Sequence, residues 1–159
     1  MNASGWSFQS IDRAKHSQLY GDSETRFPFY TLITYPDGGL ITSIQDMSLY
    51  LQELIRASDG KGRLLQAESY RQLFAPALED SHFEDRDSEF LYNDEYNYGL
   101  FMGHTPIGYI GHTGGDPGVS TFMFFDPEEN IGWMLFINTD LNSQEDVDQL
   151  FAIWDALRN

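Results

Sequence analysis

Apolar residues recur at helical spacing over residues 43–57. Leu51 lies four residues after Met47, and Leu54 and Ile55 lie three and four residues after Leu51. These intervals mark one face of an α-helix. Ser43 precedes this run, and Asp46 lies three positions after Ser43. This pair is an acidic relative of the capping box. The pattern predicts a helix from about residue 43 to 57.

Two further segments have the same period. Residues 67–74 carry apolar side chains and end before Pro76, which disfavours helix at the residue that precedes it. Residues 143–157 begin at Ser143, a favourable N-cap. The expected apolar face of this last helix consists of Val147, Leu150, Phe151, Trp154 and Leu157. A short helix and a longer C-terminal helix are therefore predicted.

The periodicity changes in the second half of the chain. Four short segments of strand character, separated by turn residues, occupy residues 98–102, 107–111, 119–125 and 131–138. Four meandering strands followed by an amphipathic helix predict an α+β fold, with an antiparallel sheet of about four strands and the C-terminal helix packed on it. We assign residues 1–95 to a helical and loop region and residues 96–159 to the sheet and its helix, both within one fold.

Composition narrows the range of possible functions. The chain of 159 residues has a net charge of −16, which argues against a nucleic-acid partner because phosphates need Lys and Arg to neutralise them. Much of the charge lies in residues 79–95. A solvated loop is the ordinary interpretation of such a stretch; a site for a cation or a basic partner has no ligand spacing to support it.

The residue types present exclude further classes of site and segment. The chain has no cysteine, so thiol nucleophiles and zinc–thiolate sites are excluded. His16, His82 and His104 form no metal-ligand pattern, and we expect neither a metal nor a cofactor. No membrane span or signal peptide is visible, because the most apolar runs have only strand length.

Two glycine-rich clusters are candidates for chemistry. The first is Tyr35-Pro36-Asp37-Gly38-Gly39-Leu40, before the first helix, and the second spans residues 111–118, expected between two strands. Dense glycine indicates either chain turning or the close approach of another group to the backbone. Each cluster alone favours a turn.

Taken in order, the motifs resemble a known family. After the first cluster and its Ser-capped helix come Tyr98-Gly99-Leu100, then Gly111-His112-Thr113-Gly114-Gly115, then Asp126-Pro127 and a strand ending in Asn138-Thr139. This set resembles the C-terminal half of the β-lactamase-related serine hydrolases, which include class C β-lactamases, D-alanyl-D-alanine carboxypeptidases, esterases and D-amino-acid peptidases. The resemblance covers about residues 4 to 155. Members often act in the periplasm or outside the cell, but the sequence does not assign a location.

The resemblance implies roles for one motif. His112, Thr113 and Gly114 correspond to the family's Lys/His-Thr-Gly wall of the active site. Thr113 and Gly114 are expected to bind the substrate, and His112 to assist by its charge or a hydrogen bond. The N–H of Gly115 is expected to be an oxyanion donor. A strand-end histidine without a role is the alternative for His112.

The resemblance also implies a missing part. The family's Ser-x-x-Lys nucleophile and its Tyr-x-Asn motif lie upstream of the matched region. Ser58-Asp59-Gly60-Lys61 matches the Ser-x-x-Lys pattern. It lies at the end of the first predicted helix, in a loop that contains glycine, and we interpret the match as coincidence. Tyr92-Asn93 and Tyr96-Asn97 lack the spacer.

Two functions remain open. The chain is either the C-terminal part of a serine hydrolase that cleaves a small acyl substrate (a β-lactam, a D-peptide or an ester) or a non-catalytic binding or scaffold module derived from that fold. We expect the chain alone to be inactive. We also expect an uncovered sheet edge, and therefore self-association or pairing with the missing N-terminal part.

Overall fold

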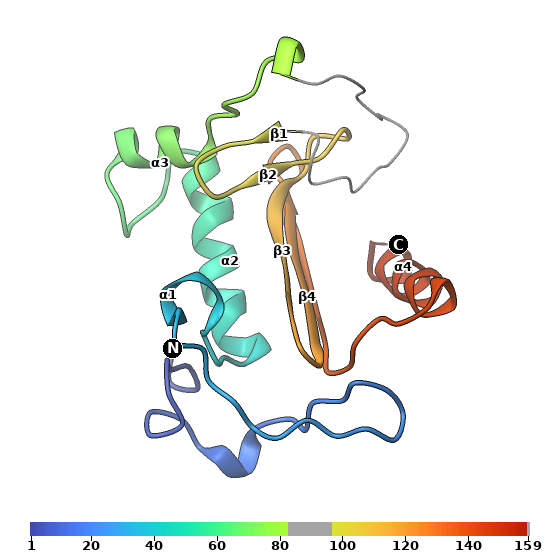
Figure 1. Ribbon diagram of the computed structural model, residues 1–159. Helices are drawn as coiled ribbons and strands as arrows, with labels where there is room; N and C mark the ends of the chain where they lie inside the picture. The colour runs from blue at the N-terminus through green and yellow to red at the C-terminus, as the bar shows by residue number, and fades with distance from the viewer. Residues whose placement is uncertain (83–96, 159) are drawn as a thin grey trace. The chain divides into compact units, whose positions relative to one another are not determined.

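The computed structural model describes residues 1–82 and 97–158 (Figure 1). Most of the predicted acidic loop, together with Tyr92-Asn93 and Tyr96, therefore lies outside the described residues. The elements, in chain order, are η1 (Arg13–Lys15), α1 (Tyr35–Gly38), α2 (Ile44–Ser58), α3 (Ala67–Phe74), η2 (Asp80–His82), β1 (Asn97–Tyr98), β2 (Gly103–His104), β3 (Ile110–Asp116), β4 (Val119–Asp126), β5 (Ile131–Ile137) and α4 (Gln144–Arg158).

Two compact units interleave along the chain. The first unit contains Met1–Leu49, Gly114–Phe122 and Trp133–Asn159, and the second contains Tyr50–Thr113 and Met123–Gly132. The long strands and helix α2 continue from one unit into the other.

The three predicted helices are confirmed within a residue of their expected ends. The N–H of Asp46 donates to Ser43 Oγ at 3.2 Å at the start of α2. The start of α4 repeats this contact between Asp146 and Ser143, and Asp146 Oδ2 accepts the N–H of Ser143 at 2.9 Å. These reciprocal bonds satisfy donors that a helix start leaves unpaired. The apolar face of α4 is shorter than expected, because Leu157 is largely exposed.

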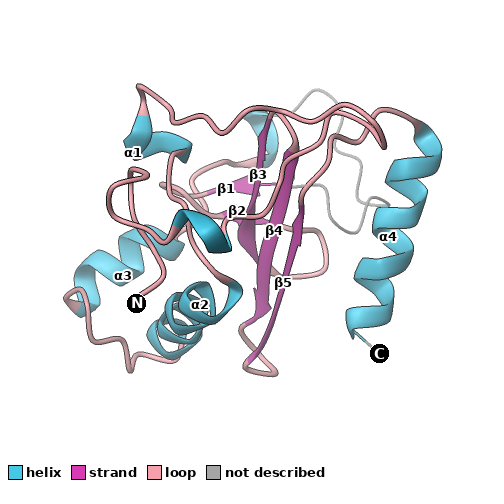
Figure 2. Cartoon of the chain, turned by 90° about the horizontal axis from the view of Figure 1, so that it is seen from below, coloured by secondary structure: helices cyan, strands magenta, loops and turns pink. Residues whose placement is uncertain are grey.

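The antiparallel α+β fold is also confirmed, with five strands in the order β1-β2-β3-β4-β5 (Figure 2). The expected strands at residues 98–102 and 107–111 were wrong in extent. The first is reduced to the two-residue strand β1, and β2 lies in the connection expected between the two strands. Strand β3 begins at Ile110 and runs to Asp116. The physical reason is that glycines 111, 114 and 115 lie extended inside β3 rather than in a turn. The cluster at residues 35–38 likewise forms one helical turn, α1, after a mostly irregular N-terminal segment.

The core of the second unit is formed where α2 and α3 meet strand residues. Phe124, Phe125 and Leu54 are its largest fully buried side chains, and the rings of Phe74 and Phe125 meet edge-on at 6.0 Å between centroids. A methyl group built on Gly132 would lie 2.8 Å from Leu51 Cδ2. Glycine there lets the helix approach the strand closely.

The first unit has a smaller core and a polar clasp. Trp154 of α4 is buried and its ring lies 6.0 Å from that of Phe122 on β4. Asp46 is 8% exposed and accepts bonds from the N–H groups of Asn2 (3.2 Å) and Ala3 (2.7 Å) and from Ser4 Oγ (2.7 Å). The clasp fixes the N-terminal segment on the first turn of α2.

Among the described residues, no helix has the length and apolar character needed to cross a bilayer.

Truncating Phe124 should be costly. Its side chain is 0% exposed, so Phe124→Ala removes buried apolar contacts and leaves a cavity, which costs about 3–5 kcal/mol. Urea denaturation followed by fluorescence should show the loss as a lower midpoint. Ile33 is 99% exposed, and Ile33→Ala should leave the midpoint unchanged. Equal effects of the two variants would contradict this description of the core.

The Asp46 clasp should make stability depend on pH. The hydroxyl of Ser4, followed by the N–H groups of Ala3 and Asn2, holds the pKa of Asp46 below its usual value. A carboxyl group with a lowered folded-state pKa stabilises the protein above its unfolded pKa of about 3.9, and loses that effect as the pH falls through the folded-state pKa. The wild type should therefore be more stable than Asp46→Asn at pH 6, and the difference should shrink towards pH 2 in urea titrations. A constant difference across this range would argue against a charged clasp.

Candidate active-site wall

The motif residues lie on β3, on a stretch that extends past its neighbour β2. Strand β2 pairs with β3 only at Gly103↔Gly111 and His104↔Ile110. Residues 112–116 continue beyond this pairing, and no described strand adjoins them on that side. Figure 1 shows β3 and β4 as a long hairpin. The stretch of β3 that carries the motif is therefore an open sheet edge within the described part of the chain.

The turn at the end of the hairpin decides which main-chain groups face this edge. Pro117 and Gly118 (φ 78°) form a two-residue connection between β3 and β4. In such a hairpin the closing pair, Asp116 and Val119, is hydrogen-bonded, and the next residue inward directs its N–H and C=O away from the partner strand. That residue is Gly115.

Contacts along the hairpin agree with this register. A methyl group built on Gly114 would lie 2.6 Å from Thr121 Oγ1, and one built on Gly111 would lie 2.1 Å from the Met123 carbonyl oxygen. Gly111 is also the residue whose outward side pairs with β2. The outward positions therefore continue from Gly111 to Thr113 and Gly115.

The three glycines differ in their surroundings. Gly111 is buried, and a side chain there would meet the β4 backbone. Gly115 is exposed, and nothing lies within 4 Å of a methyl group built on it. Packing therefore requires glycine at position 111. At position 115 packing makes no such demand, because the space on the side-chain side of this residue is open.

His112 is exposed and its Nδ1 contacts the carbonyl oxygen of Thr113. Because a carbonyl only accepts, Nδ1 carries the proton in this contact, and in the neutral ring Nε2 is then the acceptor. The imidazole therefore presents a basic nitrogen away from its own backbone. Thr113 is half-buried.

The first glycine cluster lies against the end of the second. A methyl group built on Gly38 would lie 3.4 Å from Asp116 Oδ2. Tyr30 donates its hydroxyl to the Pro117 carbonyl oxygen at 2.8 Å, and the N–H of Gly118 donates to Asp140 Oδ1 at 2.6 Å. Sequence reasoning missed Tyr30 and Asp140, because partners 87 and 22 residues away leave no local pattern.

The electrostatic environment at this end of β3 is negative. Burial, then the charge of Asp116, then that of Asp140 raise the pKa of the Tyr30 hydroxyl. No Lys or Arg occurs between residues 97 and 157 of the sequence.

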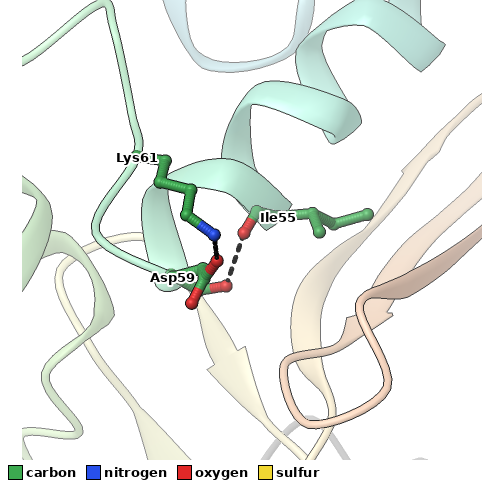
Figure 3. A network of polar contacts seen from close by, with 4 residues as sticks. Ile55, Asp59 and Lys61 are labelled. Atoms are coloured by element: carbon green, nitrogen blue, oxygen red, sulfur yellow. Dashed lines mark hydrogen bonds and ion pairs between the residues drawn. The ribbon is translucent and has the colours of Figure 1, made fainter.

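Ser58 and Lys61 of the Ser58–Lys61 string make separate contacts. Ser58 Oγ donates to the carbonyl oxygen of Ile55 at 2.8 Å, and Lys61 pairs with Asp59 (Figure 3). Gly60 lies between them with φ 72°. The serine and the lysine are therefore engaged separately, as expected for a helix end and its loop.

A buried carboxylate fixes the loop that follows. Glu53 accepts the Tyr70 hydroxyl at 2.6 Å, the N–H of Leu64 at 3.1 Å and the N–H of Arg63. The Arg63 N–H, followed by the Tyr70 hydroxyl, holds the pKa of Glu53 low. These contacts fix the backbone of residues 63 and 64 against α2.

The remaining candidates have local roles. His82 Nδ1 accepts the N–H of Glu79 at 2.8 Å, and His16 Nδ1 contacts the Ser17 carbonyl oxygen. His104 is half-buried, and burial lowers its pKa. The side-chain amide of Asn97 bonds both ways with the backbone of Leu78. Among residues 1–82 and 97–158, no group of acidic and histidine side chains is arranged to hold a metal ion.

A comparison with protein-family models identifies the family. A family model described as Beta-lactamase matches residues 3–158, which is nearly the whole chain. The fold is thus of the serine-hydrolase type. The chain belongs to the β-lactamase family. None of the curated proteins with which it was compared gave a match.

The different packing of Gly111 and Gly115 can be tested by measuring stability alone. Gly111→Ala places a methyl group against the β4 backbone and should lower the urea midpoint markedly, since overpacking costs about 1–3 kcal/mol. Gly115→Ala enters open space and should change the midpoint by no more than a typical surface substitution, about 0.5 kcal/mol. Strong destabilisation by Gly115→Ala would show that glycine 115 is required for folding.

Proposed function

We propose that this chain provides one wall of the active site of a serine hydrolase that cleaves amide or ester bonds. The observation that carries the proposal is Gly115: its N–H faces a strand edge that no described strand covers, and nothing lies within 4 Å of a methyl group built on it. Membership of the β-lactamase family supports the same reading.

Each motif residue then has a role. When a nucleophile attacks the acyl carbon, the carbonyl oxygen gains negative charge, and the Gly115 N–H donates to it. A fixed donor of this kind contributes about 3–4 kcal/mol to acyl transfer. Thr113 and Gly114 belong to β3, and the acyl group lies along this part of the strand. His112, which presents Nε2, assists by hydrogen bonding or, when protonated, by its charge.

The nucleophile is proposed to come from a part of the protein outside this sequence. The engagement of Ser58 with Ile55 supports this, as does that of Lys61 with Asp59. An uncovered β3 edge and the family fold further favour pairing with that part or, in its absence, self-association. The alternative is a binding or scaffold module, which would retain the wall without any nucleophile.

A serine-reactive fluorophosphonate probe distinguishes these functions. The 159-residue chain should remain unlabelled and should not hydrolyse a nitrophenyl ester above background, because an oxyanion donor cannot attack. The product of the complete gene should be labelled at one serine and should turn over the ester. Removing a nucleophile lowers turnover by several orders of magnitude.

Ser58→Ala provides the matched control and should change neither labelling nor turnover. Stoichiometric labelling of the short chain at Ser58 would show that the string is a nucleophile after all. Absence of labelling in the complete gene product would favour the scaffold module.

A further inference from the structure

We infer that Asp140 and Tyr30 are positioning residues of this site: from outside the β3–β4 hairpin, they anchor its turn and so fix the end of β3 that carries the Gly115 N–H. The inference rests on the proposed function and adds two residues that act on the oxyanion donor without touching the substrate. All of the groups concerned lie in the first unit.

The turn is of a type that a two-residue hairpin does not favour. Proline has its φ fixed at about −65°, and Gly118, which follows Pro117, has φ 78°. A proline followed by a residue of positive φ is the signature of a type II turn. Types I′ and II′, whose twist matches that of paired strands, need a positive φ at the first position, and type II splays the strands. Contacts from outside the hairpin therefore help to hold this turn in place.

The end of β3 has no neighbouring strand to restrain it on its outer side. Within the described part of the chain, β2 pairs with β3 only as far as Gly111. An oxyanion donor acts only if its place is fixed before the reaction, since a misplacement of about 1 Å can cost about a hundredfold in rate. The placement of the Gly115 N–H therefore depends on β4 and on the turn that follows Asp116.

Asp140 holds one end of the central peptide group of this turn. Gly118 is buried, and its N–H donates to Asp140 Oδ1 at 2.6 Å. Asp140 is itself held, because its N–H donates to the Tyr20 carbonyl oxygen at 2.9 Å. The N–H of Tyr20 donates in turn to the Asn138 carbonyl oxygen at 3.0 Å. The carboxylate thus ties the turn to the chain that leaves β5.

Tyr30 holds the other end of the same peptide group. Its hydroxyl donates to the Pro117 carbonyl oxygen at 2.8 Å, and that carbonyl shares a peptide bond with the Gly118 N–H. Burial, followed by the charges of Asp116 and Asp140, raises the pKa of the Tyr30 hydroxyl, so the hydroxyl keeps its proton and remains a donor. Because a peptide group is planar, the two bonds together set both the place and the orientation of the centre of the turn.

The test uses the product of the complete gene with a p-nitrophenyl ester and its thionoester, in which sulfur replaces the carbonyl oxygen. Sulfur is a weak hydrogen-bond acceptor. The ratio of the two kcat/KM values, each divided by the hydroxide-catalysed rate of the same compound, therefore reports how well the oxyanion donor is placed. Asp140→Ala should lower kcat for the oxygen ester about 10- to 100-fold and should lower this ratio.

Two further variants separate positioning from general damage to the fold. Asp140→Asn retains an oxygen that can accept the Gly118 N–H, and it should restore most of the rate and of the ratio. Tyr30→Phe removes only a hydroxyl group and should lower the rate and the ratio in the same direction as Asp140→Ala. Equal losses toward the ester and the thionoester would show a purely structural role and would overturn the inference, as would full activity of Asp140→Ala.

Asp126→Ala is the matched control. Asp126 is half-buried like Asp140, and its Oδ1 accepts the N–H groups of Glu128 (2.8 Å) and Glu129 (3.1 Å) in the turn at the other end of β4. This variant removes the same kind of contact at a distant turn, so the oxygen-to-sulfur ratio should stay at the wild-type value. A ratio lowered as much as in Asp140→Ala would contradict a specific role for the β3–β4 turn.

Hydrogen exchange of the same protein, followed by mass spectrometry, needs no turnover. Asp140→Ala should speed exchange in the peptide that covers β3 and its turn, whereas Asp126→Ala should speed it only around residues 126–131. Unchanged exchange at the β3–β4 turn of Asp140→Ala would refute the anchoring directly and leave the hydrolase intact. If no ester is hydrolysed and no serine is labelled by the fluorophosphonate probe, the proposed function itself fails and the positioning role fails with it.

Discussion

The two-residue turn between β3 and β4 is the constraint from which the candidate site follows. Pro117 pre-sets one backbone angle, and Gly118 supplies a φ of 78° that other residues rarely adopt. With the turn fixed, the register of the hairpin is fixed, and an alternation of period two then assigns every main-chain N–H of β3 either to β4 or to the open edge. A turn longer by one residue would move Gly115 to the inward set and remove the donor.

Several carboxylates stabilise the fold through local contacts with loop backbone rather than through contacts across the sheet. Asp46 satisfies N–H groups of the N-terminal segment, Glu53 satisfies those of the loop after α2, and Asp140 satisfies the N–H of Gly118. Each carboxylate replaces water around backbone donors that have no ladder partner. A chain of strongly negative net charge thus uses some of its acidic residues as structural acceptors.

Much of the fold could be predicted from the sequence, because helix signals are local. Ser43 and Ser143 marked two helix starts correctly, and the period of Leu51 and Leu54 identified a buried face. The boundaries of β3 could not be predicted in the same way. Its glycines are typical of a turn when considered locally, and only pairing with β4 makes them extended. The site was predicted as a motif at residues 112–115, whereas Tyr30 and Asp140 bind the turn that follows it through tertiary contacts that no spacing records.

The open space at Gly115 also has an evolutionary consequence. Because folding places no demand on that position, drift would replace glycine with other residues unless ligand binding were under selection. Gly111 offers the internal comparison, since its contact with the β4 backbone preserves glycine for folding whether or not the protein binds anything. Among natural variants of this chain, position 111 therefore records only that the sheet is intact, and position 115 records whether the strand edge is still in use.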